Sequence, residues 1–419
     1  MRIRPPLSRA RSRAARRTTV GAAVALAVLA LAPPARAGAK LRAGPHTTLD
    51  LGFSLHDHGL VSRDHADADQ DRELAPRLLI RRARLRLDAN VTEHFGARLQ
   101  TDRGDGDGRL GVEYRLIDAF FVARAAAPLQ LRVGLHLAPS QRQNVTGSSG
   151  LLVFDRPGLA FKALTWGTRA LLQFGNRAAP GTDAGLRLAA PVRDMGATLH
   201  GDLALARELH LKYFAGAYEG VRRAGGTPVR TTGRVQLNFG DPEPGYFVSG
   251  TYFGRKRTVG IGASVDAQPR VARDEALGVV GYRLLSADLF VEQPLAGHTL
   301  TFEGGVTSLA LGGATRLDAD GDPTTPATDA RRAEGAGAYA QVALTVGRIQ
   351  PWLGYEAWQA RDVAGSYDAF RFGVTHVIDL AGGIANLKLA YEHARLEIPS
   401  ATLGGRSLGT LAVGLFFNY

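Results

Sequence analysis

The chain has 419 residues, with 51 Lys plus Arg, 39 Asp plus Glu, no cysteine and a formal net charge of +12. Eight arginines and no acidic residue lie in residues 1–37, so residues 38–419 carry 51 − 8 = 43 basic and 39 acidic side chains, a net charge of +4. This near balance removes the case for a nucleic-acid-binding protein, and the lack of cysteine excludes a disulfide-stapled fold.

The first predicted element is a secretory signal peptide over residues 1–37. Seven arginines precede an uncharged apolar run, Val20–Ala32, and the small-residue site Ala35-Arg36-Ala37 follows it. The run is too short to cross a bilayer as a helix. Arg16-Arg17 would suit a twin-arginine signal, but the flanking residues do not, and we favour export of the unfolded chain. We expect residues 38–419 to form one domain.

Residues 38–419 alternate between apolar and polar side chains in stretches of about ten residues, with Gly, Pro, Asp or Asn between them. A period of two is typical of β-strands. The stretches 80–89 and 129–137 illustrate it, because one face is apolar, from Leu129 to Leu137 in the second, and the other face is polar and basic. The arginines on these polar faces are Arg82, Arg84, Arg86 and Arg132.

The C-terminus decides between the two destinations of such a chain, a soluble periplasmic β-protein and an outer-membrane barrel. The last nine residues alternate strictly, with Leu411, Val413, Leu415 and Phe417 on one face and the aromatic Tyr419 at the end. This pattern is typical of the terminal strand by which the barrel-assembly machinery recognises its substrates. We therefore predict an all-β, transmembrane antiparallel barrel of about 16 strands, since a strand with its connection takes about 24 residues.

Several segments, in the same order along the chain, resemble the phosphate-selective porin O and P family. They are residues 80–87, 131–136, 193–201, 240–246, 250–253 and 385–392. The resemblance implies a 16-stranded homotrimeric barrel in the outer membrane of a Gram-negative cell. It also implies an inward-folded third loop that constricts the pore and arginine-rich walls that attract anions. Family members carry more lysine near the constriction, whereas this chain has five lysines in all.

The candidate binding residues lie on the predicted lumen face and in the predicted constriction loop, residues 139–161. Guanidinium groups stay charged and can bind an oxyanion with two parallel hydrogen bonds, and inward positions on one strand are about 6.6 Å apart. A row of arginines could therefore pass phosphate along the wall. The candidates are Arg82, Arg84, Arg86, Arg98 and Arg132 on the wall, and Arg142, Arg156 and Lys162 in or beside the loop.

We predict a passive porin that conducts small anions, with phosphate or polyphosphate as candidate solutes and outer-membrane lipid around it. Two alternatives stay open: a general, weakly selective porin, and a plugged structural or adhesive barrel. If every wall arginine faced a carboxylate, the general porin would be favoured. No catalytic motif indicates an enzyme, and no cofactor or metal is expected. Residues 318–329 loosely resemble a calcium loop, but Pro323 stands where such a loop needs glycine.

Overall fold

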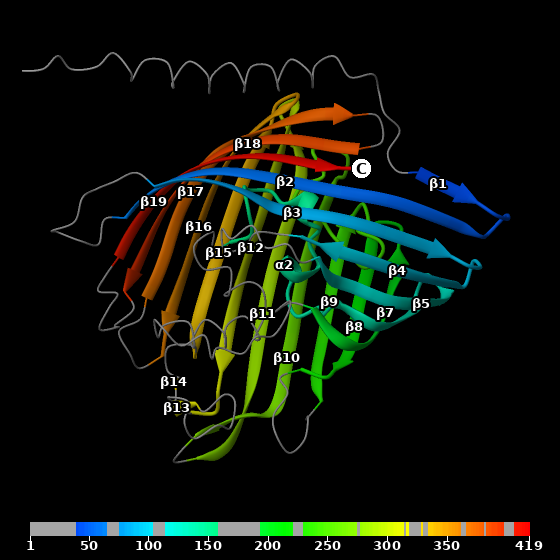
Figure 1. Cartoon of the computed structure of the whole chain (residues 1–419), viewed down its shortest axis with the longest axis horizontal. Helices are drawn as coiled ribbons and strands as arrows, with labels where there is room; N and C mark the ends of the chain where they lie inside the picture. The colour runs from blue at the N-terminus through cyan, green and yellow to red at the C-terminus, as the bar shows by residue number, and fades with distance from the viewer. Residues whose placement is uncertain are drawn as a thin grey trace, which may run out of the picture.

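The computed structural model describes residues 39–64, 75–103, 114–157, 193–220, 229–274, 277–313, 316–317, 328–329, 334–361, 366–380, 383–397 and 406–419. The predicted signal peptide and Lys162 lie outside these residues. Among the described residues, sixteen antiparallel strands form the wall of a closed barrel (Figure 1), which confirms the predicted fold class and strand number. No helix in the described part of the chain is long and apolar enough to cross a membrane.

The wall strands follow one another around the barrel. In chain order they are β2 (Thr48–Asp64), β3 (Ala75–Asn90), β4 (Phe95–Asp102), β5 (Arg115–Ala126), β6 (Leu129–Leu137), β7 (Arg193–Ala206), β8 (Leu209–Tyr218), β9 (Arg230–Gly240), β10 (Thr258–Asp274), β11 (Gly278–Leu295), β12 (His298–Ala310), β15 (Gly335–Thr345), β16 (Ile349–Ala360), β17 (Ser366–Leu380), β18 (Gly383–Glu397) and β19 (Arg406–Asn418). The remaining elements are β1 (Ala39–Arg42), a hairpin of β13 (Arg316–Leu317) and β14 (Thr328–Asp329), the helix α2 (Arg142–Val145) and the 3₁₀ turn η2 (Ser148–Gly150).

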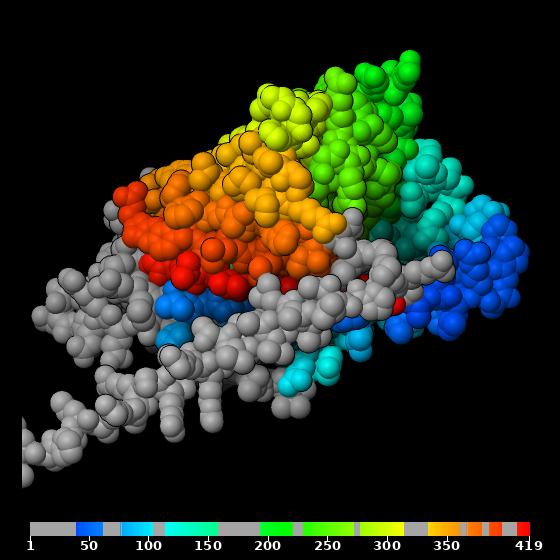
Figure 2. All heavy atoms as spheres, turned by 90° about the horizontal axis from the view of Figure 1, so that it is seen from above, coloured from blue at the N-terminus to red at the C-terminus, as the bar shows by residue number. Residues whose placement is uncertain are grey.

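The barrel closes where the last strand meets the first wall strand. β19 pairs antiparallel with β2, from Leu408 opposite Asp64 to Asn418 opposite Ser54. In Figure 2 the red atoms of β19 accordingly lie against the blue atoms of β2. The short strand β1 pairs with β2 beyond the end of β19. Because the barrel is closed, each wall strand has a hydrogen-bonded neighbour on both sides. A β-sheet can span a bilayer only when no strand edge is left unpaired.

The two faces of the wall divide as the sequence predicts, with apolar side chains outside and polar ones inside. On the outer face Phe121 is 73% exposed and Val306 is 56% exposed. The largest fully buried side chains include Arg142, Arg230 and Arg234, all inside the barrel. A soluble β-sandwich would show the reverse arrangement.

Among the places where the alternation fails, two involve residues that contact the constriction. A β-bulge interrupts the pairing of β2 with β3 opposite Arg81, so that both Arg81 and Arg82 reach the interior. Leu137, predicted to share the outer apolar face, instead packs inside against Val145 and Tyr246 at the end of β6. Both deviations occur where the wall meets a segment that folds into the barrel.

Candidate pore constriction

Residues 138–157, here called the constriction segment, leave the end of β6 and cross the interior of the barrel (Figure 1). Most of the segment is buried. Its path along the wall is marked by hydrogen bonds: Ser264 Oγ donates to Ser140 O at 2.6 Å, and Gln143 Nε2 donates to Glu303 Oε1 at 2.6 Å. Because these partners stand on β10 and β12, the first part of the segment lies against the wall opposite β3–β6. Farther along, Ser148 accepts a hydrogen bond at 3.3 Å from Arg84 Nη1 of β3. The predicted inward-folded loop is confirmed over its described part.

Residues 241–257, here called the inserted turn, join β9 to β10 at the end of the barrel where the other connections are short. Gly240, with φ +85°, opens this turn, and a Cβ there would stand 2.3 Å from Arg257 O. The turn enters the lumen from the end opposite to the constriction segment. The two segments meet through backbone hydrogen bonds, including Val248 N to Val145 O at 2.9 Å and Gly147 N to Val248 O at 3.0 Å.

A buried ion pair joins the same two segments. Arg142 donates through Nη1 to Glu243 Oε2 at 2.9 Å and through Nη2 to Glu243 Oε1 at 2.8 Å, and both side chains are inaccessible to solvent. Burial alone would raise the pKa of Glu243, but the guanidinium of Arg142 outweighs it and lowers that pKa to about 2. Burial likewise opposes the charge of Arg142, yet Glu243 holds its pKa above the usual value. Both groups are therefore charged at neutral pH.

The far end of the constriction segment is fixed to the C-terminal strands. Leu152 and Phe154 are buried in an apolar cluster with Trp352 and Phe416. Lys388 on β18 donates from Nζ to the carbonyls of Leu151 and Val153, both at 2.7 Å. These contacts hold the segment across the barrel at both ends and leave the wall β3–β6, here called the open wall, as the side with partly exposed charges.

Arg82 does not line an open channel, which differs from the sequence expectation. Its side chain is 1% exposed and its Nη2 lies 3.7 Å from Asp155 Oδ1 at the end of the constriction segment. Arg81, brought inward by the bulge, donates from Nε to Asp155 Oδ2 at 3.3 Å. One carboxylate thus serves two guanidinium groups, and this pair of arginines fastens the segment to β3.

The next arginines along the open wall are more exposed than Arg82, and each has a carboxylate partner. Arg84 Nε lies 2.9 Å from Asp102 Oδ2. Arg86 and Arg98 share Asp88, with Nε to oxygen distances of 3.0 Å and 2.5 Å. Arg86 is the most open of them, at 43% side-chain exposure.

Arg132 on β6 is the exception among the predicted wall arginines. None of the ion pairs found in the described part of the chain includes it, and its buried Nε and Nη1 have no hydrogen-bond partner there. Its guanidinium carbon instead lies 3.9 Å from the centre of the Tyr246 ring and 4.9 Å from that of Phe120. Four of the five wall arginines therefore face a carboxylate, and one faces aromatic rings.

The two described loop candidates hold the constriction segment together, in contrast to the expectation that they line its narrowest point. Arg142 is fully buried in the pair with Glu243. Arg156 is 8% exposed and donates to the carbonyls of Gln143 and Thr146, at 3.0 Å and 2.8 Å. Burial lowers the pKa of Arg156 to about 10, so it too stays charged at neutral pH.

Sequence reasoning missed Arg81, Glu243, Tyr246 and Lys388 as interior residues of consequence. A bulge changes which residues face inward without changing the amino-acid composition of the strand, so the sequence did not indicate that Arg81 faces the lumen. The run Gly240-Asp-Pro-Glu-Pro-Gly245 has the composition of an exposed turn. The connection is longer than the others at that end of the barrel, and only this length could have indicated that it folds into the lumen.

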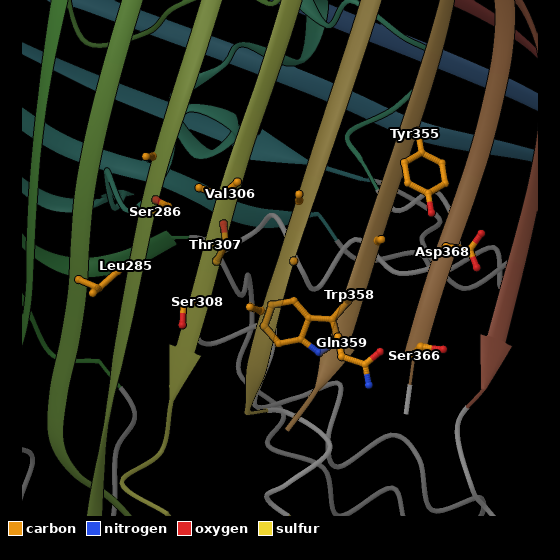
Figure 3. Close-up of a pocket in the computed structure, with 15 residues that line it drawn as sticks. Leu285, Ser286, Val306, Thr307, Ser308, Tyr355, Trp358, Gln359, Ser366 and Asp368 are labelled. Carbon is orange, nitrogen blue, oxygen red and sulfur yellow. The ribbon is translucent and has the colours of Figure 1, made fainter. Parts of the chain in front are cut away.

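One depression on the described surface lies on the outer wall. It has a volume of about 760 Å³ and is formed across β11–β17 (Figure 3). Its flanks include Leu285, Val306 and Tyr355, which are 46%, 56% and 48% exposed, with the small residues Ala336 and Ala338 between them. Its apolar character suits a lipid-facing surface.

A closed sixteen-stranded antiparallel barrel with an apolar outer wall and a charged interior, narrowed by inward-folded segments, is the architecture of outer-membrane porins. Solved structures of that class share the fold. OmpT, an outer membrane protein of Vibrio cholerae, gives a TM-score of 0.51 at 10% identity, over 91% of this chain and 100% of that one. An anion-selective porin from Comamonas acidovorans gives 0.51 at 11% identity, over 89% and 100%.

OprB of Pseudomonas putida gives a TM-score of 0.50 at 10% identity, over 88% of this chain and 94% of that chain. No family model and no curated protein matches the sequence. The likeness is thus one of fold, to outer-membrane porins, and the solute must be argued from this chain's own residues.

Proposed function

We propose that this protein is a passive outer-membrane porin that conducts small anions between the constriction segment and the open wall. The support is the charge balance of that wall. Among the described side chains of β3, β4 and β6, six arginines face two aspartates, and Asp155 of the constriction segment adds a third carboxylate. The buried Asp118 of β5 is balanced by Arg193 of β7. The inward-facing charges are Arg81, Arg82, Arg84, Arg86, Arg98 and Arg132 against Asp88 and Asp102.

The opposite side of the interior contributes little to this balance. There Arg371 on β17 lies between Glu356 and Glu392, and Arg234 pairs with Asp288, all with side chains at most 5% exposed. A buried, paired charge exerts a small net field on a passing ion, whereas partly exposed guanidinium groups offset part of the hydration that an anion loses in a narrow pore. An ion crossing the lumen therefore experiences mainly the surplus of arginine on the open wall.

Phosphate is a candidate solute within this proposal, but the arrangement favours a general anion preference. The arginines expected to pass phosphate along the wall already form ion pairs, Arg84 with Asp102 and Arg86 with Asp88. A phosphate would have to displace a carboxylate at each step. Chloride, phosphate and small carboxylates would all benefit from the net charge without such displacement.

The test is single-channel recording of the purified protein in planar bilayers, with the reversal potential measured in a KCl gradient and phosphate then titrated in. Anion-selective steps support the proposal, and block by sub-millimolar phosphate would add phosphate selectivity. Arg86→Ala is expected to lower anion preference. The matched control is Arg283→Ala, which removes an arginine from the exposed outer face of β11. Large steps without ion preference would establish a general porin, and silence from folded protein a plugged barrel.

We further propose that copies of the chain associate as a trimer through the outer face of β4–β6. β4 and β6 have 8 and 9 residues, against 18 in β11. Their outer face carries a depression of about 350 Å³ lined by Phe95, Phe121 and Leu131, to which a neighbouring subunit could fit. Light scattering of the detergent-solubilised protein, with Phe121→Glu as the variant, tests this. A monomeric wild-type protein would refute it.

A further inference from the structure

The tip of the inserted turn lies directly against the lumen wall of β6–β8. Tyr246 is 2% exposed, and its hydroxyl donates a hydrogen bond to Leu137 O. Its ring makes edge contacts with Phe214, at 5.2 Å between centroids, and with His200, at 5.1 Å. These contacts come from three strands, β6, β7 and β8, and fix both the position and the tilt of the ring.

The face of the Tyr246 ring supports Arg132. The guanidinium carbon lies 3.9 Å from the ring centre, and Phe120 and Phe247 lie at 4.9 Å and 5.6 Å. An aromatic face attracts a cation through its quadrupole without cancelling the charge. A carboxylate holds a guanidinium equally well, but it also removes the net charge that a passing anion would experience.

This difference separates Arg132 from its neighbours on the open wall. Arg98 also lies over Phe120 and Phe247, at 5.8 Å and 5.9 Å, yet it is paired with Asp88 at 2.5 Å. Arg132 as a residue has intermediate exposure, although its Nε and Nη1 are buried, and it has no such partner among the described residues. Arg132 is thus held in place with its full positive charge.

Two carboxylates of this part of the wall are engaged by groups other than Arg132. Asp118 on β5 pairs with Arg193, with 2.7 Å between Oδ1 and Nε. Asp202 on β7 is 3.8 Å from Lys212 Nζ, and its other oxygen accepts a hydrogen bond from the backbone N–H of Gly245 at 2.9 Å. The turn therefore occupies one oxygen of the Asp202 carboxylate. Asp118 and Asp202 are therefore held by groups other than Arg132.

We infer that Tyr246 is a specificity-determining positioning residue: by holding Arg132 without a carboxylate, it makes the inserted turn the origin of the anion preference. The inference rests on the proposed function and names the residues that produce it. The solutes it concerns are small anions, both chloride and oxyanions, that pass the Arg132 side chain. Tyr246 acts through Arg132 and does not itself bind the ion.

The experiment compares Arg132→Ala, Tyr246→Leu, Tyr246→Phe and the double variant Arg132→Ala/Tyr246→Leu in the full-length, folded protein. The measured quantity is the ratio of chloride to potassium permeability from the reversal potential in a KCl gradient, and heat-modifiable migration on SDS gels confirms folding. Removing a unit charge about 6 Å from the ion's path, screened by about 0.1 M salt, is expected to lower the ratio about threefold in Arg132→Ala. Tyr246→Leu should lower it about twofold, because the guanidinium loses its support.

Tyr246→Phe keeps the ring and should leave the ratio unchanged, which makes it the matched control. In the Arg132→Ala background, Tyr246→Leu should have no further effect. If Arg132→Ala lowers the ratio and Tyr246→Leu does not, the role of Tyr246 is refuted while the anion porin stands. An equal effect of Tyr246→Leu in both backgrounds would also overturn the inference, since the ring would then act without Arg132. If Arg132→Ala leaves the permeability ratio unchanged, the role of Tyr246 is refuted. If the wild-type protein shows no ion preference, the proposed function is refuted as well.

Discussion

The ion pair between Arg142 and Glu243 should carry most of the coupling between the two segments that enter the barrel. Replacing Arg142 by Met leaves the buried Glu243 without its main cation. Replacing Glu243 by Gln leaves the buried guanidinium with only Glu303, whose Oε1 lies 3.6 Å from Arg142 Nε. Removing one partner of a buried pair typically costs about 3–5 kcal/mol, whereas removing both costs less. We therefore expect Arg142→Met and Glu243→Gln each to destabilise the protein strongly and the double variant to recover part of the loss.

The magnitude follows from the pKa of Glu243. The pair lowers it from 4.5 to about 2, which corresponds to about 3 kcal/mol of stabilisation of the charged form. Because the pKa in the folded protein is lower than in the unfolded chain, this stability is present above pH 4.5. It is lost as the pH falls from 4.5 through about 2. The coupling energy of the double-mutant cycle should therefore be about 3 kcal/mol at pH 7 and decline toward pH 2.

Equilibrium unfolding in urea, followed by tryptophan fluorescence in detergent micelles at pH 7 and at pH 3, measures the cycle. The control pair is Lys40 and Asp50, an exposed pair with 47% and 34% side-chain exposure, for which a coupling near zero is expected. A coupling for Arg142 and Glu243 below about 1 kcal/mol at pH 7 would refute the reasoning. So would a coupling that does not change with pH.

Two further predictions concern the pore itself. Lys388→Met removes the donor to two carbonyls of the constriction segment, so single-channel recordings should show larger and noisier current steps. The barrel should keep its heat-modifiable migration on SDS gels. Quiet steps of wild-type size would contradict this prediction. Asp88→Asn releases Arg86 and Arg98 from the carboxylate they share and should raise the ratio of chloride to potassium permeability about threefold, measured from the reversal potential. An unchanged or lower ratio would show that these arginines do not act on the permeating ion.

The composition of the open wall could be predicted from local sequence, but the pairing of its charges could not. Alternation assigned Arg84 and Arg86 to the interior, as the structure has them. Whether an arginine of the open wall is paired with a carboxylate depends on contacts between residues that are far apart in the sequence. Asp155 reaches Arg81 across 74 residues, and Tyr246 reaches Arg132 from a turn that the sequence marks as ordinary surface chain.

The sequence by itself determined the barrel. A strand has a period of two, so each residue's face follows from its neighbours, and the apolar outer band and the terminal alternation up to Tyr419 are written in consecutive residues. The tertiary structure alone decided the interior. A bulge moved Arg81 inward, Leu137 turned toward the lumen, and two segments from opposite ends met through Arg142 and Glu243. These events depend on packing and charge between residues far apart in the chain, and local periodicity carries no information about such contacts.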